Sequence, residues 1–139
     1  MLGSMLLMLE DDPERIAQFE AALSTLPSPP SLRIWSDANH MIAEAPEWMP
    51  HATLVSLDHD LIPADGMPDP GDGYSVVQWL TSQPHIRPVI IHTSNAERAA
   101  WMTGEFDLNG WTYHRVLPLD QNWVLDWWLP TVREILALG

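Results

Sequence analysis

The chain has 139 residues, the length of one ordinary domain, and its 46% hydrophobic content supports a buried core and excludes general disorder. Nineteen acidic against six basic residues give a net charge of −13, which excludes unaided binding to nucleic acid or anionic lipid and favours cations as ligands. The absence of cysteine excludes a disulfide framework, a thiolate nucleophile and a cysteine-ligated zinc site.

No apolar stretch approaches the roughly 18 residues of a membrane span. We therefore expect a soluble protein, with the cytoplasm as its default location. Residues 1–4 precede a second methionine, Met5, and could be a remnant of cloning, so we expect the fold to begin at Met5. We treat residues 1–139 as a single domain.

Apolar runs typical of buried parallel strands alternate along the chain with segments of helical periodicity. In chain order we expect a strand at 5–9, a helix at 13–26, a strand at 32–35, a helix at 37–45, a strand at 53–57, a helix at 74–82, a strand at 89–92, a helix at 95–106, a strand at 111–117 and a last helix. Pro46 is expected to close the second helix.

The last helix is rich in tryptophan. Its apolar stripe is predicted to consist of Leu125, Trp128, Leu129, Val132 and Leu136. Trp123 and Trp127 lie one turn apart near the edge of this stripe. If exposed, they would contribute to a homodimer or to a surface for a protein partner, because tryptophan is enriched at interfaces.

Five strand-helix repeats predict a three-layer, doubly wound α/β fold with a five-stranded parallel sheet in the order 2-1-3-4-5. Right-handed crossovers place the carboxyl ends of all strands at one edge of such a sheet. The ligand crevice is expected there, between the first and third strands.

Polar side chains follow the three strands at this crevice. They are Glu10, Asp11 and Asp12 after the first strand, Asp58 and Asp60 after the third, and His92, Thr93, Ser94 and Asn95 at the end of the fourth. Crowded carboxylates repel one another, and a hard cation such as Mg²⁺ or Mn²⁺ relieves this more simply than raised pKa values do. Alternatively, Asp12 only caps the first helix, and Glu10 and Asp11 favour its positive end.

Four motifs, in this order, resemble a response-regulator receiver domain: LEDDP at 9–13, LD at 57–58, GDG at 71–73 and PVIIHTS at 88–94. The resemblance implies that Glu10 and Asp11 bind Mg²⁺. It also implies that Asp58 accepts a phosphoryl group and that the Thr93 hydroxyl contacts that group.

The chain departs from this family at the end of its fifth strand. Receivers have a lysine there, whereas this chain reads RVLP at 115–118 and contains no lysine at all. Arg115 or His114 could supply positive charge, but a guanidinium fork or an imidazole does not replace an ammonium point charge. The departure weakens the case for phosphorylation of Asp58.

Two strings are foreign to ordinary receivers: LDHDL at 57–61 and HTSN at 92–95. They resemble the family of cyclic-phosphate-processing receiver domains, and this resemblance implies phosphate chemistry. Because an imidazole titrates near neutrality, His59 or His92 could also bind a metal or act as general acid or base. Asp60 could add a metal ligand. The structural alternatives are a hydrogen-bonded core residue at His92 and a turn cap at Asp60.

Other polar residues have two interpretations or only a structural one. Ser94 and Asn95 could donate hydrogen bonds to a phosphate or simply cap a helix. The long loop from 61 to 73 is either a lid over the pocket or an insertion. Structural roles are assigned to the remaining histidines, which are His40, His51, His85 and His114.

Three functions remain open. The first is a stand-alone, atypical receiver that binds Mg²⁺ or Mn²⁺, takes phosphate from a phosphodonor or small molecule, and signals through a protein partner. The second is a metal-dependent phosphoesterase acting on cyclic phosphates, with His59 or His92 handling the proton. The third is a degenerate receiver that serves only as a protein-interaction module. Whether the protein is an enzyme is left open by the residues.

Overall fold

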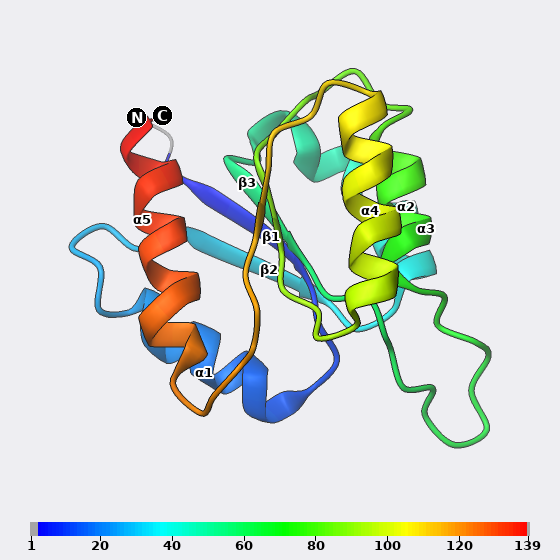
Figure 1. Ribbon diagram of the computed structural model, residues 1–139, viewed down its shortest axis with the longest axis horizontal. Helices are drawn as coiled ribbons and strands as arrows, with labels where there is room; N and C mark the ends of the chain where they lie inside the picture. The colour runs from blue at the N-terminus through cyan, green and yellow to red at the C-terminus, as the bar shows by residue number, and fades with distance from the viewer. Residues whose placement is uncertain (1–2, 139) are drawn as a thin grey trace.

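The computed structural model describes residues 3–138, and its centre is a five-stranded parallel sheet (Figure 1). The strands are β1 (Met5–Leu9), β2 (Ser31–Trp35), β3 (Leu54–Leu57), β4 (Val89–Ile91) and β5 (Tyr113–Arg115), in the order β2-β1-β3-β4-β5. The predicted doubly wound fold and strand order are therefore confirmed. Of the suggested cloning remnant, residues 1 and 2 lie outside the described residues.

Helices cover both faces of the sheet, so that the molecule has three layers (Figure 1). They are α1 (Pro13–Leu23), α2 (Ala38–Trp48), α3 (Gly73–Leu80), α4 (Ala96–Leu108) and α5 (Leu129–Leu138), with a 3₁₀ turn η1 (Met49–His51) and a π turn η2 (Val124–Trp128). Helices α1 and α5 pack on one face, and α2, α3 and α4 pack on the other (Figure 1). Within residues 3–138, every helix is too short or too polar to cross a bilayer.

Alternation along the buried strands divides the core into two halves. In β1, Leu7 and Leu9 face α2 and α3, whereas Leu6 and Met8 face α1 and α5. This division follows from the period of two in a strand, where neighbouring side chains point to opposite faces. A strand whose side chains are apolar on both faces fits a sheet that is covered by helices on both faces.

The strand register determines where the polar residues meet. Leu9 pairs with Leu57, which in turn pairs with Ile91. The Asp58 N–H donates to the Leu9 carbonyl at 3.0 Å, and the His92 N–H donates to the Leu57 carbonyl at 2.9 Å. The residues that follow these three strands therefore start from one level at the edge of the sheet.

The prediction that Pro46 closes the second helix is wrong, because α2 continues through it to Trp48. Pro46 lies in the last turn, where a missing N–H removes only the hydrogen bond that would have reached the Ile42 carbonyl. The Met49 N–H still donates to the Ala45 carbonyl, so the helix ends normally after the proline.

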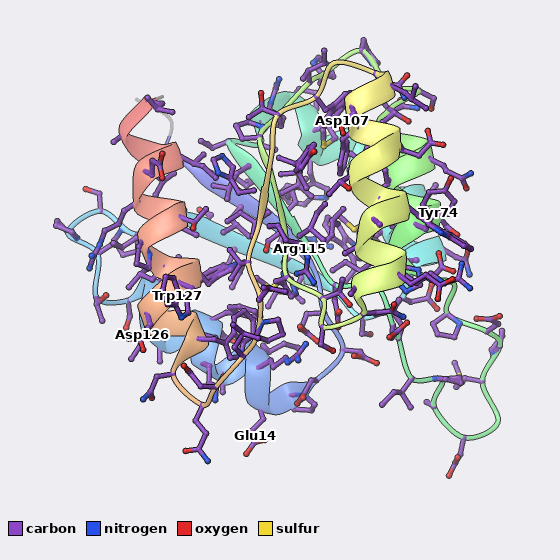
Figure 2. All side chains as sticks on the ribbon, in the orientation of Figure 1. Glu14, Tyr74, Asp107, Arg115, Asp126 and Trp127 are labelled. Carbon is purple, nitrogen blue, oxygen red and sulfur yellow. The ribbon has the colours of Figure 1, made fainter. Side chains whose placement is uncertain are left out.

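The predicted stripe of the last helix is also partly wrong. Leu125 is 54% exposed, and Trp123, which was expected near the edge of the stripe, is only 5% exposed. The cause is the π turn η2, which adds a residue to the turn and brings positions five apart onto one face. Trp123 and Trp128 therefore both point into the core, while Trp127 remains 57% exposed beside Asp126 (Figure 2).

Candidate metal and phosphate site

Three carboxylates gather where β1 and β3 end. Glu10, Asp11 and Asp58 each present an oxygen, and these oxygens all lie within 4.8 Å of one another. The parallel register explains the cluster, since both strands end at the same level. Oxygen donors of this kind suit a hard cation such as Mg²⁺ or Mn²⁺.

Glu10 is the most buried member of the cluster, with no exposed surface. Its Oε2 accepts hydrogen bonds from the N–H groups of Asp11 and Asp12, both at 3.1 Å, and its Oε1 lies 3.1 Å from His92 Nε2. Burial acts to raise the pKa of Glu10, but the hydrogen bond and charge of His92 and the Asp12 N–H outweigh burial and lower that pKa. Glu10 is therefore a fixed negative charge at the base of the cluster.

His92 connects Glu10 to the core through a buried chain of hydrogen bonds. Trp128 Nε1 donates to Ser56 Oγ at 3.1 Å, and Ser56 Oγ lies 2.8 Å from His92 Nδ1. A carboxylate can only accept, so the proton of the hydrogen bond to Glu10 belongs to His92 Nε2, while Ser56 Oγ accepts from the indole and can either accept from or donate to Nδ1. With no exposed surface, His92 holds Glu10 in place and does not face the solvent.

Asp58 lies beside Glu10 and is 6% exposed. Its Oδ1 accepts the His59 N–H at 2.8 Å. Burial raises the pKa of Asp58 to about 6, and the neighbouring charge of Glu10 adds to this, while His92 and Arg15 oppose it. Ionised Asp58 therefore costs free energy in the folded protein, which a bound cation would recover.

Stability should consequently depend on pH through Asp58. Its pKa is raised from 3.8 to about 6, so the folded protein binds more protons than the unfolded chain in this range, and stability falls as the pH rises through it. We expect Asp58→Asn to gain about 1–3 kcal/mol over the wild type at about pH 8, and much less at about pH 4. Urea unfolding of both proteins with a chelator present measures this difference. A wild type that is the more stable of the two at high pH would contradict the expectation.

Arg15 completes the cluster and was missed by the sequence argument. Its Nη1 lies 3.6 Å from both Glu10 Oε1 and Asp58 Oδ2, and its guanidinium carbon lies 5.4 Å from the centre of the Trp123 ring. A signal was nevertheless present in the sequence. With Asp12 as the N-cap, Arg15 falls in the first helical turn, where the helix dipole disfavours a cation.

Arg115, which is labelled in Figure 2, was considered as a substitute for the receiver lysine, but its side chain is bonded to the main chain. Its Nη1 donates to the carbonyls of Ile91 at 3.2 Å and Val116 at 2.8 Å. Burial lowers the pKa of Arg115, and the charge of Asp58 opposes that effect. This arginine thus contributes to the field at Asp58 without forming an ion pair with it.

His59 and Asp60 turn away from the carboxylate cluster. His59 is 4% exposed, and its Nδ1 lies 2.8 Å from Asp60 Oδ1. Its Nε2 is 3.8 Å from Asp72 Oδ2 and has no hydrogen-bond partner among residues 3–138. Asp60 also accepts from Asn95 Nδ2, and the His59 hydrogen bond lowers the pKa of Asp60. Asp60 therefore lies outside the group of Glu10, Asp11 and Asp58.

The residues after β4 mainly organise the start of α4. Asn95 is its N-cap, with Oδ1 accepting the Arg98 N–H at 3.0 Å. The Thr93 hydroxyl oxygen accepts the Asn95 N–H at 3.1 Å and is buried, whereas Ser94 is exposed. The capping alternative thus accounts for the Asn95 side chain, while Thr93 and Ser94 retain hydroxyl protons that can be donated.

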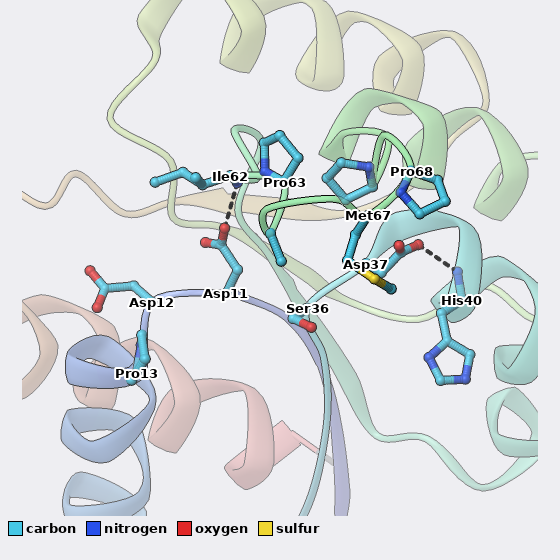
Figure 3. Close-up of a pocket in the computed structure, with 12 residues that line it drawn as sticks. Asp11, Asp12, Pro13, Ser36, Asp37, His40, Ile62, Pro63, Met67 and Pro68 are labelled. Atoms are coloured by element: carbon cyan, nitrogen blue, oxygen red, sulfur yellow. Dashed lines mark hydrogen bonds between the residues drawn. The ribbon is translucent and has the colours of Figure 1, made fainter.

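A cleft of about 850 Å³ opens beside Asp11, between the ends of β1 and β2 and the long loop (Figure 3). The Ile62 N–H donates to Asp11 Oδ2 at 2.6 Å. This hydrogen bond connects the loop at 61–73 to the carboxylate cluster. Pro63, Met67 and His40 also line this cleft. His40 was given only a structural role, and it does bond to a helix neighbour, yet it also borders the candidate site.

The fold and the acidic strand ends define a receiver domain. The family of cyclic-phosphate processing receiver domains matches residues 5–107, about three quarters of the chain, and the chain belongs to that family. This confirms the resemblance inferred from the sequence motifs. No curated protein sequence matches the chain significantly.

Solved structures of receiver domains share the fold. The phosphorylated cyanobacterial phytochrome response regulator RcpA superimposes with a TM-score of 0.72 at 19% identity, covering 99% of this chain and 96% of its own. The response regulator domain of Thermotoga maritima CheB gives a TM-score of 0.69 at 16% identity, covering 99% and 98%. The Mn²⁺-bound response regulator Rcp1 gives 0.66 at 19% identity, covering 92% and 96%. At these identities the likeness concerns the fold alone.

Proposed function

We propose that this receiver domain binds Mg²⁺ or Mn²⁺ through Asp11 and Asp58, with Glu10 assisting, and takes a phosphoryl group at Asp58. The observation that carries the proposal is the cluster of three carboxylates within 4.8 Å. The raised pKa of Asp58 supports it, because repulsion among these groups is what a cation would relieve. Two structural relatives support it by analogy, since one is described as phosphorylated and another as Mn²⁺-bound.

The proposed chemistry is a transfer between oxygens. An oxygen of the Asp58 carboxylate forms a bond to phosphorus while the bond between phosphorus and the leaving group of the donor breaks. The cation, when bound, supplies positive charge that offsets the carboxylates and the phosphoryl oxygens. Thr93 and Ser94 are proposed to donate their hydroxyl protons to those oxygens. Asn95 is proposed to position this segment as the helix cap it already forms.

Calorimetric titration of Mg²⁺ and Mn²⁺ into the wild type and Asp58→Asn tests the proposal. We expect binding by the wild type and a loss of at least about tenfold in the variant, since a charged ligand has been removed. Asp60→Asn is the matched control, because Asp60 is also a carboxylate near the strand end but lies outside the cluster. No binding by the wild type, or equal binding by the wild type and Asp58→Asn, would refute the metal site.

Hydrolysis of a cyclic phosphate is the second candidate function, favoured by the name of the family and by His59 Nε2, which has no hydrogen-bond partner in the described part of the chain. His59 and His92 are only 4% and 0% exposed, so the receiver function ranks first. Turnover of 2′,3′- and 3′,5′-cyclic nucleotides is the direct assay. Activity that survives both His59→Ala and His92→Ala would remove these histidines from the proton transfer.

The proposal also predicts two kinds of partner for this domain. A phosphodonor or a phosphate-bearing small molecule would reach Asp58, and a protein partner or second copy would meet an apolar surface. Leu117, Leu119 and Trp127 are 44%, 74% and 57% exposed, and they border a groove of about 240 Å³. This surface is also where a degenerate receiver without metal or phosphate would act. A cytoplasmic location and the absence of direct nucleic-acid binding are retained as proposals.

A further inference from the structure

Arg15 is a cation in an unusual position. It lies in the first turn of α1, where the helix dipole opposes positive charge, whereas its exposed neighbour Glu14 points outward from the same turn (Figure 2). The ion pairs with Glu10 and Asp58 offset this cost. The position of Arg15 is therefore explained by its contacts with these two carboxylates and not by the preference of the helix terminus.

Three of the other arginines have partners elsewhere, although Nη2 of Arg115 is buried with no hydrogen-bond partner among residues 3–138. Arg33 pairs with Glu44, Arg87 donates to the Ala52 carbonyl, and Arg115 donates to main-chain carbonyls. Within residues 3–138, Arg15 is the only arginine that forms ion pairs with Glu10 or Asp58. Since the chain contains no lysine, Arg15 is the strongest candidate for the positive charge that phosphate binding requires.

We propose that Arg15 binds the phosphoryl oxygens at Asp58, in place of the lysine that this chain lacks. The inference rests on the proposed function. Without a metal, the guanidinium neutralises Glu10 and Asp58. With a cation held by the carboxylates, the guanidinium would lose its partners there and would donate its planar fork of N–H groups to the phosphoryl oxygens.

The surroundings of Arg15 suit such a change of partner. Its contacts to the carboxylates are long, at 3.6 Å, and its side chain is 24% exposed. It borders a polar cleft of about 550 Å³ that is also lined by Asp12, Gln18 and Trp123, so the guanidinium is not enclosed by protein on that side. The buried Trp123 ring lies against the guanidinium and restricts its conformations before binding. The side chain of Arg15 therefore loses less conformational entropy when it binds a ligand.

This role predicts two opposite effects of one substitution. Arg15→Gln removes a competitor of the metal, so Mg²⁺ affinity without an anion should rise by about threefold to tenfold. The same change removes a charged donor to the phosphoryl group, so affinity for BeF₃⁻ in saturating Mg²⁺ should fall by about tenfold to a hundredfold. A merely structural role would weaken both, because it acts through the shape of the site.

Calorimetric titrations of Mg²⁺, followed by BeF₃⁻ as the phosphoryl mimic, provide the test for the wild type, Arg15→Gln and Arg98→Gln. Arg98 is a close control, because it occupies the same helical position after its N-cap and its guanidinium carbon lies 3.7 Å from the Trp101 ring centre. Among residues 3–138, the arginine ion pairs with Glu10 and Asp58 come from Arg15 and not from Arg98. Arg98→Gln should behave as the wild type in both titrations. Thermal unfolding of each variant verifies that it is folded.

The outcomes separate the two proposals. If the wild type binds neither Mg²⁺ nor BeF₃⁻, the proposed function fails, and the inference about Arg15 falls with it. If the wild type binds both, but Arg15→Gln binds BeF₃⁻ equally well or binds Mg²⁺ more weakly, only the role of Arg15 is refuted. Stronger Mg²⁺ binding together with weaker BeF₃⁻ binding in Arg15→Gln alone supports it.

Discussion

Replacing Gly73 by alanine is expected to destabilise the protein by about 2–4 kcal/mol and to weaken metal binding. A Cβ at this position would overlap the Asp58 carbonyl oxygen and lie 2.8 Å from His59 Cα. Both are backbone atoms, so no flexible side chain can move aside. The Gly73 N–H also donates to the His59 carbonyl at 2.9 Å, which ties the start of α3 to the segment that carries Asp58.

Gly104→Ala is the matched control for this substitution. Gly104 lies inside α4, and a Cβ there would meet nothing within 4 Å. Alanine is the better helix former, so this variant should be as stable as the wild type or gain about 0.5–1 kcal/mol. Denaturant unfolding and Mg²⁺ titration of both variants measure the effects. A Gly73→Ala protein with wild-type stability and Mg²⁺ affinity would show that the close approach is not needed.

The fold could be predicted because its rules are local and repetitive. The run 5–9 is apolar on both faces, which is specific to a covered parallel strand, and the N-cap residues Asp12 and Asp37 locate the starts of two helices. The helix that passes through Pro46 could not be predicted, since the cost of a proline depends on its place in the last turn. The π turn η2 was equally hidden, because no local rule in the sequence signals one extra residue.

The site was predictable as far as strand ends determine it. Parallel strands end at one edge, so the convergence of Glu10, Asp11 and Asp58 follows from topology alone. The direction of each side chain does not follow. Asp60 is two residues from Asp58, yet it faces His59 and Asn95 instead of the cluster. For Arg15 the sequence shows only that a cation lies in the first turn of a helix, and its contacts with Glu10, Asp58 and Trp123 become visible only in the tertiary structure.

The buried histidine supports the strongest prediction about the integrity of the site. His92→Leu should destabilise the protein by about 3–5 kcal/mol, because it keeps the apolar volume but leaves the buried carboxylate of Glu10 without its charged or donating partner. His92→Gln should cost clearly less, about 1–2 kcal/mol, since its amide can still donate to Glu10. Unfolding in urea at neutral pH, with a chelator present, compares the two.

A second substitution shows whether Glu10 is the reason for that cost. In the His92→Leu background, Glu10→Gln removes a buried charge that has lost its histidine partner, so the double variant should be more stable than His92→Leu alone by about 1–3 kcal/mol. In the wild-type background, the same Glu10→Gln should destabilise, because it breaks a satisfied pair. If Leu and Gln at position 92 prove equally harmful, and Glu10→Gln rescues nothing, then His92 acts through its packing on Phe19 and Trp123 and does not hold the carboxylate in place.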